Sequence, residues 1–141
     1  MKKFTLAFII LIAAFAAQSI AQIKEGPKPE QIGSYRMGII KLYKIGDTYE
    51  IKGQTKQFVD TRLIVTLGSK EQATEILQSM INYKGESGAS LDLNNPADNV
   101  ARWMGSMMGG WEIGITQMFA SSIMVSKGEL KKMIKVITEN N

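Results

Sequence analysis

The sequence predicts an α+β domain, with an antiparallel sheet of about five strands and about three helices packed on one face. The expected order of elements is β-β-β-α-α-β-β-α. Three observations lead to this prediction: a two-residue hairpin turn, two capped amphipathic helices and the lack of regular strand–helix–strand alternation. Hairpins favour antiparallel sheets. We expect a signal peptide at 1–21, an extended tether at 22–33 that holds two prolines, and a single domain at 34–141.

The N-terminus has the three parts of a cleavable secretory signal peptide. Lys2 and Lys3 supply positive charge, an uncharged apolar run continues to Ala17, and 19–21 places small residues three and one before a cut ahead of Gln22. The apolar run of about 14 residues is shorter than the roughly 20 that cross a bilayer. We therefore expect export, periplasmic or secreted. The alternative is an uncleaved anchor, and we expect contact with a membrane only through that uncleaved segment.

The composition excludes several classes of function. The chain contains neither cysteine nor histidine, which excludes Ser-His-Asp and Cys-His catalysis on this chain and the usual Cys/His zinc sites. Removing Lys2 and Lys3 leaves 15 of the 17 basic side chains against 13 acidic ones, a net charge of +2. Because no basic cluster is interleaved with aromatic residues, we expect no nucleic-acid partner.

The first half of the domain is predicted to contain three strands and a helix. Strands are expected at 36–45 and 48–52, joined by a hairpin turn at 46–47, and at 58–67, where apolar residues alternate. A capping box of Ser69 and Gln72 opens the helix, and Gly85 is placed to end it. Its apolar face contains Ala73, Ile76, Leu77, Met80 and Ile81.

The second half is predicted to contain two helices and two strands. After a polar loop at 85–95, a short helix is expected from Asn95-Pro96 to Met108, ended by two glycines. Its buried face would hold Val100, Trp103, Met104 and Met107. Strands are expected at 111–119 and 123–125. A second capping box, Ser126 to Glu129, opens the last helix. The apolar stripe of that helix contains Leu130, Met133, Ile134 and Ile137.

A repeated pattern of strand, Ser-Lys cap and helix also raises the hypothesis of a duplicated strand-strand-helix unit. The segments at 49–51 and 111–113 resemble one another upstream of the two caps. The spacings of the two copies differ, however, and capping boxes are common. Duplication is therefore an alternative organisation of the same elements.

Two groups of residues raise the hypothesis of a metal-handling protein. Thioether sulfur suits Cu(I), and five methionines lie close in sequence: Met104, Met107, Met108, Met118 and Met124. Methionine also fills irregular core space, and we expect packing here. The acidic loop 86–98 offers oxygen ligands of the kind Ca²⁺ takes, namely Glu86, Asp92, Asn94, Asn95 and Asp98. Ala97 stands where an EF-hand loop needs glycine, so turns and caps are the competing interpretation. We predict no metal site and no cofactor.

The remaining hypotheses concern binding and hydrolysis. The segment 36–52 and its flank combine basic residues with Tyr35, Tyr43 and Tyr49, as a surface for a partner or glycan would; a buried strand pair with lysines guarding its edge is the alternative. A small carboxylate-dependent hydrolase is a further alternative, although no spacing pairs two acids, and we predict no catalytic residue. By elimination, we expect an exported non-catalytic binding or accessory domain that engages a protein or cell-envelope component.

Overall fold

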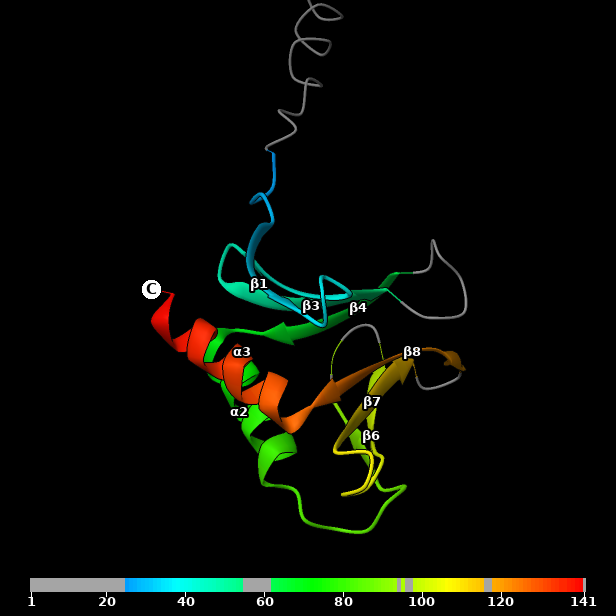
Figure 1. Cartoon of the computed structure of the whole chain (residues 1–141). Helices are drawn as coiled ribbons and strands as arrows, with labels where there is room; N and C mark the ends of the chain where they lie inside the picture. The colour runs from blue at the N-terminus through cyan, green and yellow to red at the C-terminus, as the bar shows by residue number, and fades with distance from the viewer. Residues whose placement is uncertain (1–24, 55–61, 94, 96–97, 116–117, 141) are drawn as a thin grey trace, which may run out of the picture.

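The computed structural model describes residues 25–54, 62–93, 95, 98–115 and 118–140. The expected signal peptide at 1–21 lies outside those residues, and so does the start of the strand expected at 58–67. The described chain forms two antiparallel sheets and two α-helices (Figure 1). Neither of these helices is long and apolar enough to cross a membrane.

Each sheet is a meander of four strands followed by one helix. The first comprises β1 (Glu30–Tyr35), β2 (Ile40–Ile45), β3 (Thr48–Gln54) and β4 (Arg62–Gly68), followed by α2 (Lys70–Asn82). The second comprises β5 (Ser90–Asp92), β6 (Asn99–Trp103), β7 (Gly110–Ile115) and β8 (Met118–Ser126), followed by α3 (Lys127–Glu139). The same order of elements therefore occurs twice, with four strands in each copy where the duplication hypothesis had two.

The α+β class is confirmed, but the expected number and order of elements are wrong. The described order is β-β-β-β-α-β-β-β-β-α, in two sheets of four strands with two helices. β1 begins at Glu30, inside the range expected as tether. Its register with β2 shifts between Gln31 and Gly33, and this irregularity breaks the alternation that identifies a strand in sequence. The loop expected at 85–95 likewise contains the short β5.

The short helix expected from Asn95 to Met108 is wrong, because a strand and a turn occupy this range. Apolar residues there fit both a helical and a strand period, and burial follows the strand period. The buried side chains are Asn99, Ala101 and Trp103. Asp98, with φ +48°, donates its backbone N–H to the Asn95 carbonyl at 3.0 Å, and neither of these two residues is helical. The strand expected at 111–119 is confirmed as far as Ile115, where β7 ends, and β8 begins at Met118.

The expected hairpin turn at 46–47 and both capping boxes are confirmed. In α2 the Ser69 hydroxyl accepts from the Gln72 backbone N–H at 3.4 Å, and the Gln72 side chain accepts from Ser69 at 2.9 Å. In α3 the Ser126 hydroxyl accepts from the Glu129 N–H at 3.2 Å, and the Glu129 carboxylate accepts from the Ser126 N–H at 2.7 Å. The helix predicted to end at Gly85 ends at Asn82.

A lysine at the start of each helix binds the end of the other helix. The Lys70 ammonium donates to the Thr138 carbonyl at 3.1 Å, and the Lys127 ammonium donates to the Tyr83 carbonyl. The helices consequently pack side by side in opposite directions (Figure 1). Each ammonium lies at the carbonyl end of a helix, where the helix dipole favours positive charge.

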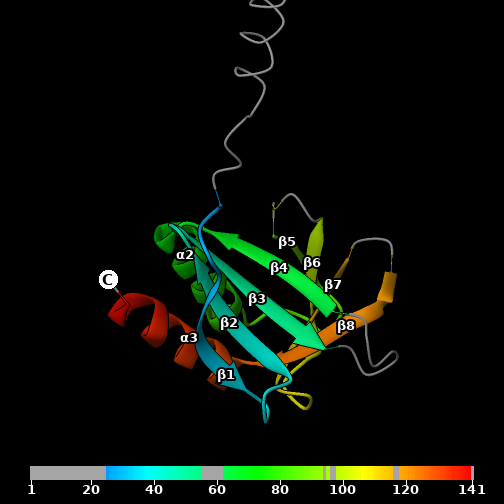
Figure 2. The same ribbon diagram turned by 90° about the horizontal axis from the view of Figure 1, so that it is seen from above.

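Apolar side chains from both sheets and both helices form one core. The helices lie beneath the first sheet, and β8 passes close to β4 (Figures 1 and 2). Leu77 of α2 is fully buried, as predicted, whereas Ile134 of α3 is only half-buried and Met133 occupies the core. The buried Trp111 ring donates its N–H to the Met80 carbonyl at 2.9 Å, which joins β7 to α2.

Candidate functional site

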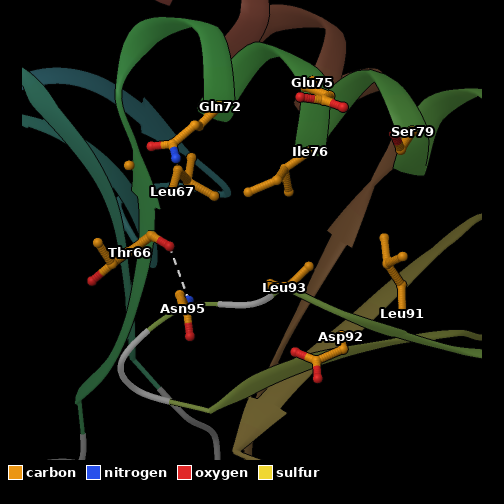
Figure 3. A pocket seen from close by; sticks show the side chains of 11 residues that line it. Thr66, Leu67, Gln72, Glu75, Ile76, Ser79, Leu91, Asp92, Leu93 and Asn95 are labelled. Carbon is orange, nitrogen blue, oxygen red and sulfur yellow. Dashed lines mark hydrogen bonds between the residues drawn. The ribbon is translucent and has the colours of Figure 1, made fainter.

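A cleft of about 410 Å³ lies between β4, α2 and β5 (Figure 3). β4 and β5 are edge strands of the two sheets, so the cleft lies where the two halves of the fold meet. Four apolar side chains line it: Leu67, Ile76, Leu91 and Leu93. The polar side chains around them belong to Thr66, Gln72, Glu75, Ser79, Asp92 and Asn95. Apolar walls with a few placed polar groups are typical of ligand-binding clefts.

Gln72 presents its amide to one end of the cleft. Its oxygen accepts from the Ser69 N–H at 2.9 Å, and this bond places the amide nitrogen on the cleft side (Figure 3). Gly68 makes room for this side chain, since a β-carbon at Gly68 would lie 2.2 Å from the Gln72 oxygen. The φ of Gly68 is +82°, a conformation that glycine adopts readily. The helix cap, together with the irregularity at the end of β4 where its register with β3 shifts, thus fixes a hydrogen-bond donor at the cleft.

Asn95 ties the two halves together at the other end of the cleft. Its side-chain nitrogen donates to the Thr66 carbonyl of β4 at 2.9 Å and to the Asn99 side-chain oxygen at 2.8 Å. Its side-chain oxygen accepts from the Asn99 backbone N–H at 3.0 Å. The Asn99 side chain is fully buried. Asn95 therefore shapes the cleft by bridging an edge strand and the loop after β5.

Both charged side chains that line the cleft are acidic. Glu75 projects from α2 and Asp92 belongs to β5, and the lining contains neither lysine nor arginine. Glu75 and Asp92 are both exposed, and acidic side chains around an apolar cleft favour a positively charged group. Chemically, the arrangement offers apolar area, one amide donor, the Ser79 hydroxyl and negative charge.

The described residues of the loop 86–98, which was considered as a calcium site, have structural roles. Asn95 bridges to β4, Asp92 lies in β5, and Asn94 lies outside the described residues. Among the described residues, no three His, Cys, Asp or Glu side chains gather as a metal site would require. The acidic character of this loop contributes instead to the rim of the cleft.

The expectation that the methionine cluster is packed in the core is wrong for two of its members. Met107 and Met108 lie on the turn between β6 and β7 and are 102% and 64% exposed. Met104 and Met124 are half-buried, and the side chain of Met118 lies outside the described part. The helical spacing of these residues predicted a buried face, but Met107 and Met108 lie in a turn, where side-chain burial does not follow a helical period.

The aromatic surface considered around 36–52 is mostly interior. Tyr35 and Tyr49 are buried, and burial raises the pKa of the Tyr35 hydroxyl. Tyr43 is half-buried, with the Lys52 ammonium 4.7 Å from its ring centre. The buried strand pair, the alternative interpretation, therefore describes most of this region.

No family model, curated protein or solved structure matches the chain. Its function has to be argued from the cleft itself. Sequence reasoning missed this cleft because its residues are spread from β4 to the loop after β5 and converge only when the two sheets are packed. The capping box at Gln72 was recognisable in sequence, but solely as a helix start.

Proposed function

We propose that this chain is an exported, non-catalytic binding domain that holds a small amphipathic cation in the cleft between β4, α2 and β5. The observation that carries this proposal is the composition of the cleft. Its lining contains four apolar side chains, and both of its charged side chains are acidic. Export rests on the leader at 1–21.

The affinity of such a ligand would come chiefly from its apolar part. Ile76 and Leu91 line the cleft and are only half-buried, so a ligand would cover apolar area that water now reaches. Covering that area stabilises a complex by about 25 cal/mol per Å² before the cost of association is subtracted. The charged end of the ligand would face Glu75 and Asp92, and Gln72 would supply a donor for orientation.

Hydrolysis by a pair of carboxylates is the alternative use of the same cleft. Glu75 and Asp92 come from different elements that line it, and paired acids cleave glycosidic bonds in many enzymes. We favour binding because four apolar side chains line the cleft, and these would contact an alkyl group better than the hydroxyl groups of a sugar. Turnover of a glycoside that disappears in Glu75→Gln would favour hydrolysis.

Calorimetric titration with three ligands that share one alkyl chain tests the binding proposal. The probes are octylamine, octanol and octanoate, added to the chain from Gln22 onward, which retains every described strand, helix and core residue. We expect the amine to bind about two- to fivefold more tightly than the alcohol, the usual contribution of exposed ion pairs. Octanoate should bind most weakly.

The double variant Glu75→Gln, Asp92→Asn should bind the amine and the alcohol equally, because the acidic rim is gone. Leu91→Ser should weaken all three ligands alike. Glu139→Gln, on the exposed end of α3, is the matched control and should leave the preference unchanged. Equal affinity for amine and octanoate, or a preference that survives in the double variant, would overturn the proposal.

A further inference from the structure

Exposed methionines surround the first turn of α3. Met37 lies in the turn between β1 and β2 and is 101% exposed, and Met107 and Met108 lie in the turn between β6 and β7. The β1–β2 turn is joined to α3 by Arg36, whose guanidinium contacts the Glu129 carboxylate at 3.1 Å. The β6–β7 turn is joined to α3 by the Gly109 carbonyl, which accepts from the Lys127 backbone N–H at 3.5 Å.

These two turns come from different sheets and project from the same side of the molecule (Figure 2). We call the methionines of the two turns, together with the 43%-exposed Ile39, the methionine surface. Single exposed apolar residues are common on soluble proteins. The contacts of Arg36 with Glu129 and of Gly109 with Lys127 bring the two turns to the same helix start, so the three exposed methionines lie at one end of the molecule.

The backbone of the first turn holds Met37 in an unfavourable conformation. Arg36 and Met37 have φ of +48° and +53°, followed by Gly38 at +86°, and Gly38 donates its N–H to the Tyr35 carbonyl at 3.1 Å. Positive φ at both central residues belongs to tight hairpin turns that strongly prefer Asn-Gly. Here a long basic and a long apolar side chain occupy these positions. Such strain is typical of functional segments.

Basic side chains continue from the methionine surface along the exposed side of α3. Lys131 and Lys132 are exposed one turn beyond Lys127, and Lys135 follows, paired with Glu139 at 3.8 Å. Arg36 neutralises Glu129, the acid in the first turn. The methionines project from turns and are exposed at 64% or more, which suits insertion between lipid headgroups better than capture of a partner's side chain. Apolar tips beside exposed lysines are the pattern of peripheral binding to anionic bilayers.

We propose that this end of the protein binds the surface of a bilayer that contains anionic phospholipids, with Met37, Met107 and Met108 inserted and Lys131 and Lys132 facing the headgroups. The sequence led us to expect membrane contact only through an uncleaved leader. This inference is independent of the cleft and needs no ligand there.

Sedimentation with vesicles tests the proposal on the chain from Gln22 onward, which lacks the apolar leader. The vesicles contain phosphatidylcholine alone or equal parts phosphatidylcholine and phosphatidylglycerol. Binding should be at least tenfold stronger with phosphatidylglycerol and should fall as salt screens the lysines. The triple variant Met37→Ser, Met107→Ser, Met108→Ser and the charge variant Lys131→Glu, Lys132→Glu should each lose most of this binding.

Ile64→Ser with Ile115→Ser is the matched control, because these two residues are also exposed and apolar, at 45% and 40%, but lie on strands of the two sheets. It should bind vesicles like the unchanged chain. Three results would overturn the proposal: no preference for phosphatidylglycerol, equal loss in the control, or self-association that the methionine variant abolishes while vesicle binding is absent. Circular dichroism of each variant verifies that it is folded.

Discussion

The two helices of this protein have different neighbours in equivalent positions. α3, which ends the second half, packs against β1, the first strand of the first half. α2, which ends the first half, faces β5, the first strand of the second half, and the cleft lies between them (Figure 3). One side of the molecule is therefore closed and the corresponding side is open.

Differences in a few residues account for this asymmetry. β1 has six residues and β5 has three, so β5 provides less surface to cover a helix. The residue after β1 is Arg36, which pairs with Glu129 in the capping box of α3. The residue after β5 is Leu93, and the matching capping residue of α2 is the neutral Gln72. Both Leu93 and Gln72 line the cleft. The two halves share the same order of elements, and the candidate site lies where these few residues differ between them.

The largest expected effect concerns the two helix positions that lie eight residues after their capping serines. Leu77 of α2 is fully buried, so Leu77→Ala should cost about 2–5 kcal/mol of unfolding free energy. Ile134 of α3 is half-buried, so Ile134→Ala should cost about half as much. Urea denaturation of both variants measures the difference. Equal losses would show that Ile134 is buried as deeply as Leu77 and would contradict the placement of Met133, and not Ile134, in the core.

The bridge at the end of the cleft should have the next largest effect. Asn95→Ala removes three hydrogen bonds and leaves partly buried partners on β4 and β6 unsatisfied, at a cost of about 1–3 kcal/mol. Octylamine affinity should fall with it, since the cleft loses one wall. Asn82→Ala, which removes only an exposed contact to Gln78, is the control and should stay within about 0.5 kcal/mol. Unchanged stability in Asn95→Ala would rule out the bridge.

The lysines that join the helix ends should differ in a measurable way. Lys127 lies 4.5 Å from the centre of the Trp103 ring in addition to binding the Tyr83 carbonyl, so Lys127→Met should cost about 1–2 kcal/mol. Lys70 binds the Thr138 carbonyl at an exposed helix end, so Lys70→Met should cost about 0.5 kcal/mol. Thermal unfolding compares them. A larger loss of stability for Lys70→Met than for Lys127→Met would contradict the prediction that Lys127 makes the stronger contacts.

The smallest effect is a pH dependence in the second sheet. Burial acts to raise the pKa of Glu112, but hydrogen bonds from Arg102 and Ser122 and the Arg102 charge outweigh it and hold this pKa below its usual value. A carboxylate whose pKa is lower in the folded state stabilises the fold above its unfolded pKa, and that contribution disappears as the pH falls through the folded pKa. The stability gap between the unchanged chain and Glu112→Gln should therefore shrink below about pH 4.5.

Ser122→Ala removes one of the bonds to Glu112 and should raise the pKa of this carboxyl, measured by NMR titration. A gap that widens toward acid pH would contradict the sign given above. A Glu112 pKa that does not respond to Ser122→Ala would show that the Ser122 hydrogen bond does not lower it.

Local signals in the sequence identified the elements whose stability is local. The Ser69 and Ser126 caps and the turn at 46–47 satisfy backbone groups within a few residues, so their patterns can be read directly. β6 was misread because its apolar residues fit a helix as well as a strand, and only pairing with β5 and β7 decides between the two. β1 and β5 gave weak signals because one is irregular and the other is short.

The candidate site could not be predicted for a related reason. The cleft depends on how the edges of two sheets approach each other, and that packing is not encoded in the spacing of any motif. Glu75 and Asp92 are separated in sequence and look like ordinary surface acids, while Gln72 looks like a helix cap. The composition did indicate the classes of chemistry to exclude, because the absence of histidine and cysteine holds whatever the fold.

NMR of isotope-labelled methyl groups during titration with octylamine tests the central claim most directly. The account predicts that the methyl signals of Leu67, Ile76 and Leu91, around the cleft, shift with a common saturation curve. Ile32 on β1 and Ile134 on α3, which report on the closed side, should not shift. Shifts at Ile32 and Ile134 equal to those at the cleft, or no saturable shift at the cleft, would contradict the claim that the open side is the binding site.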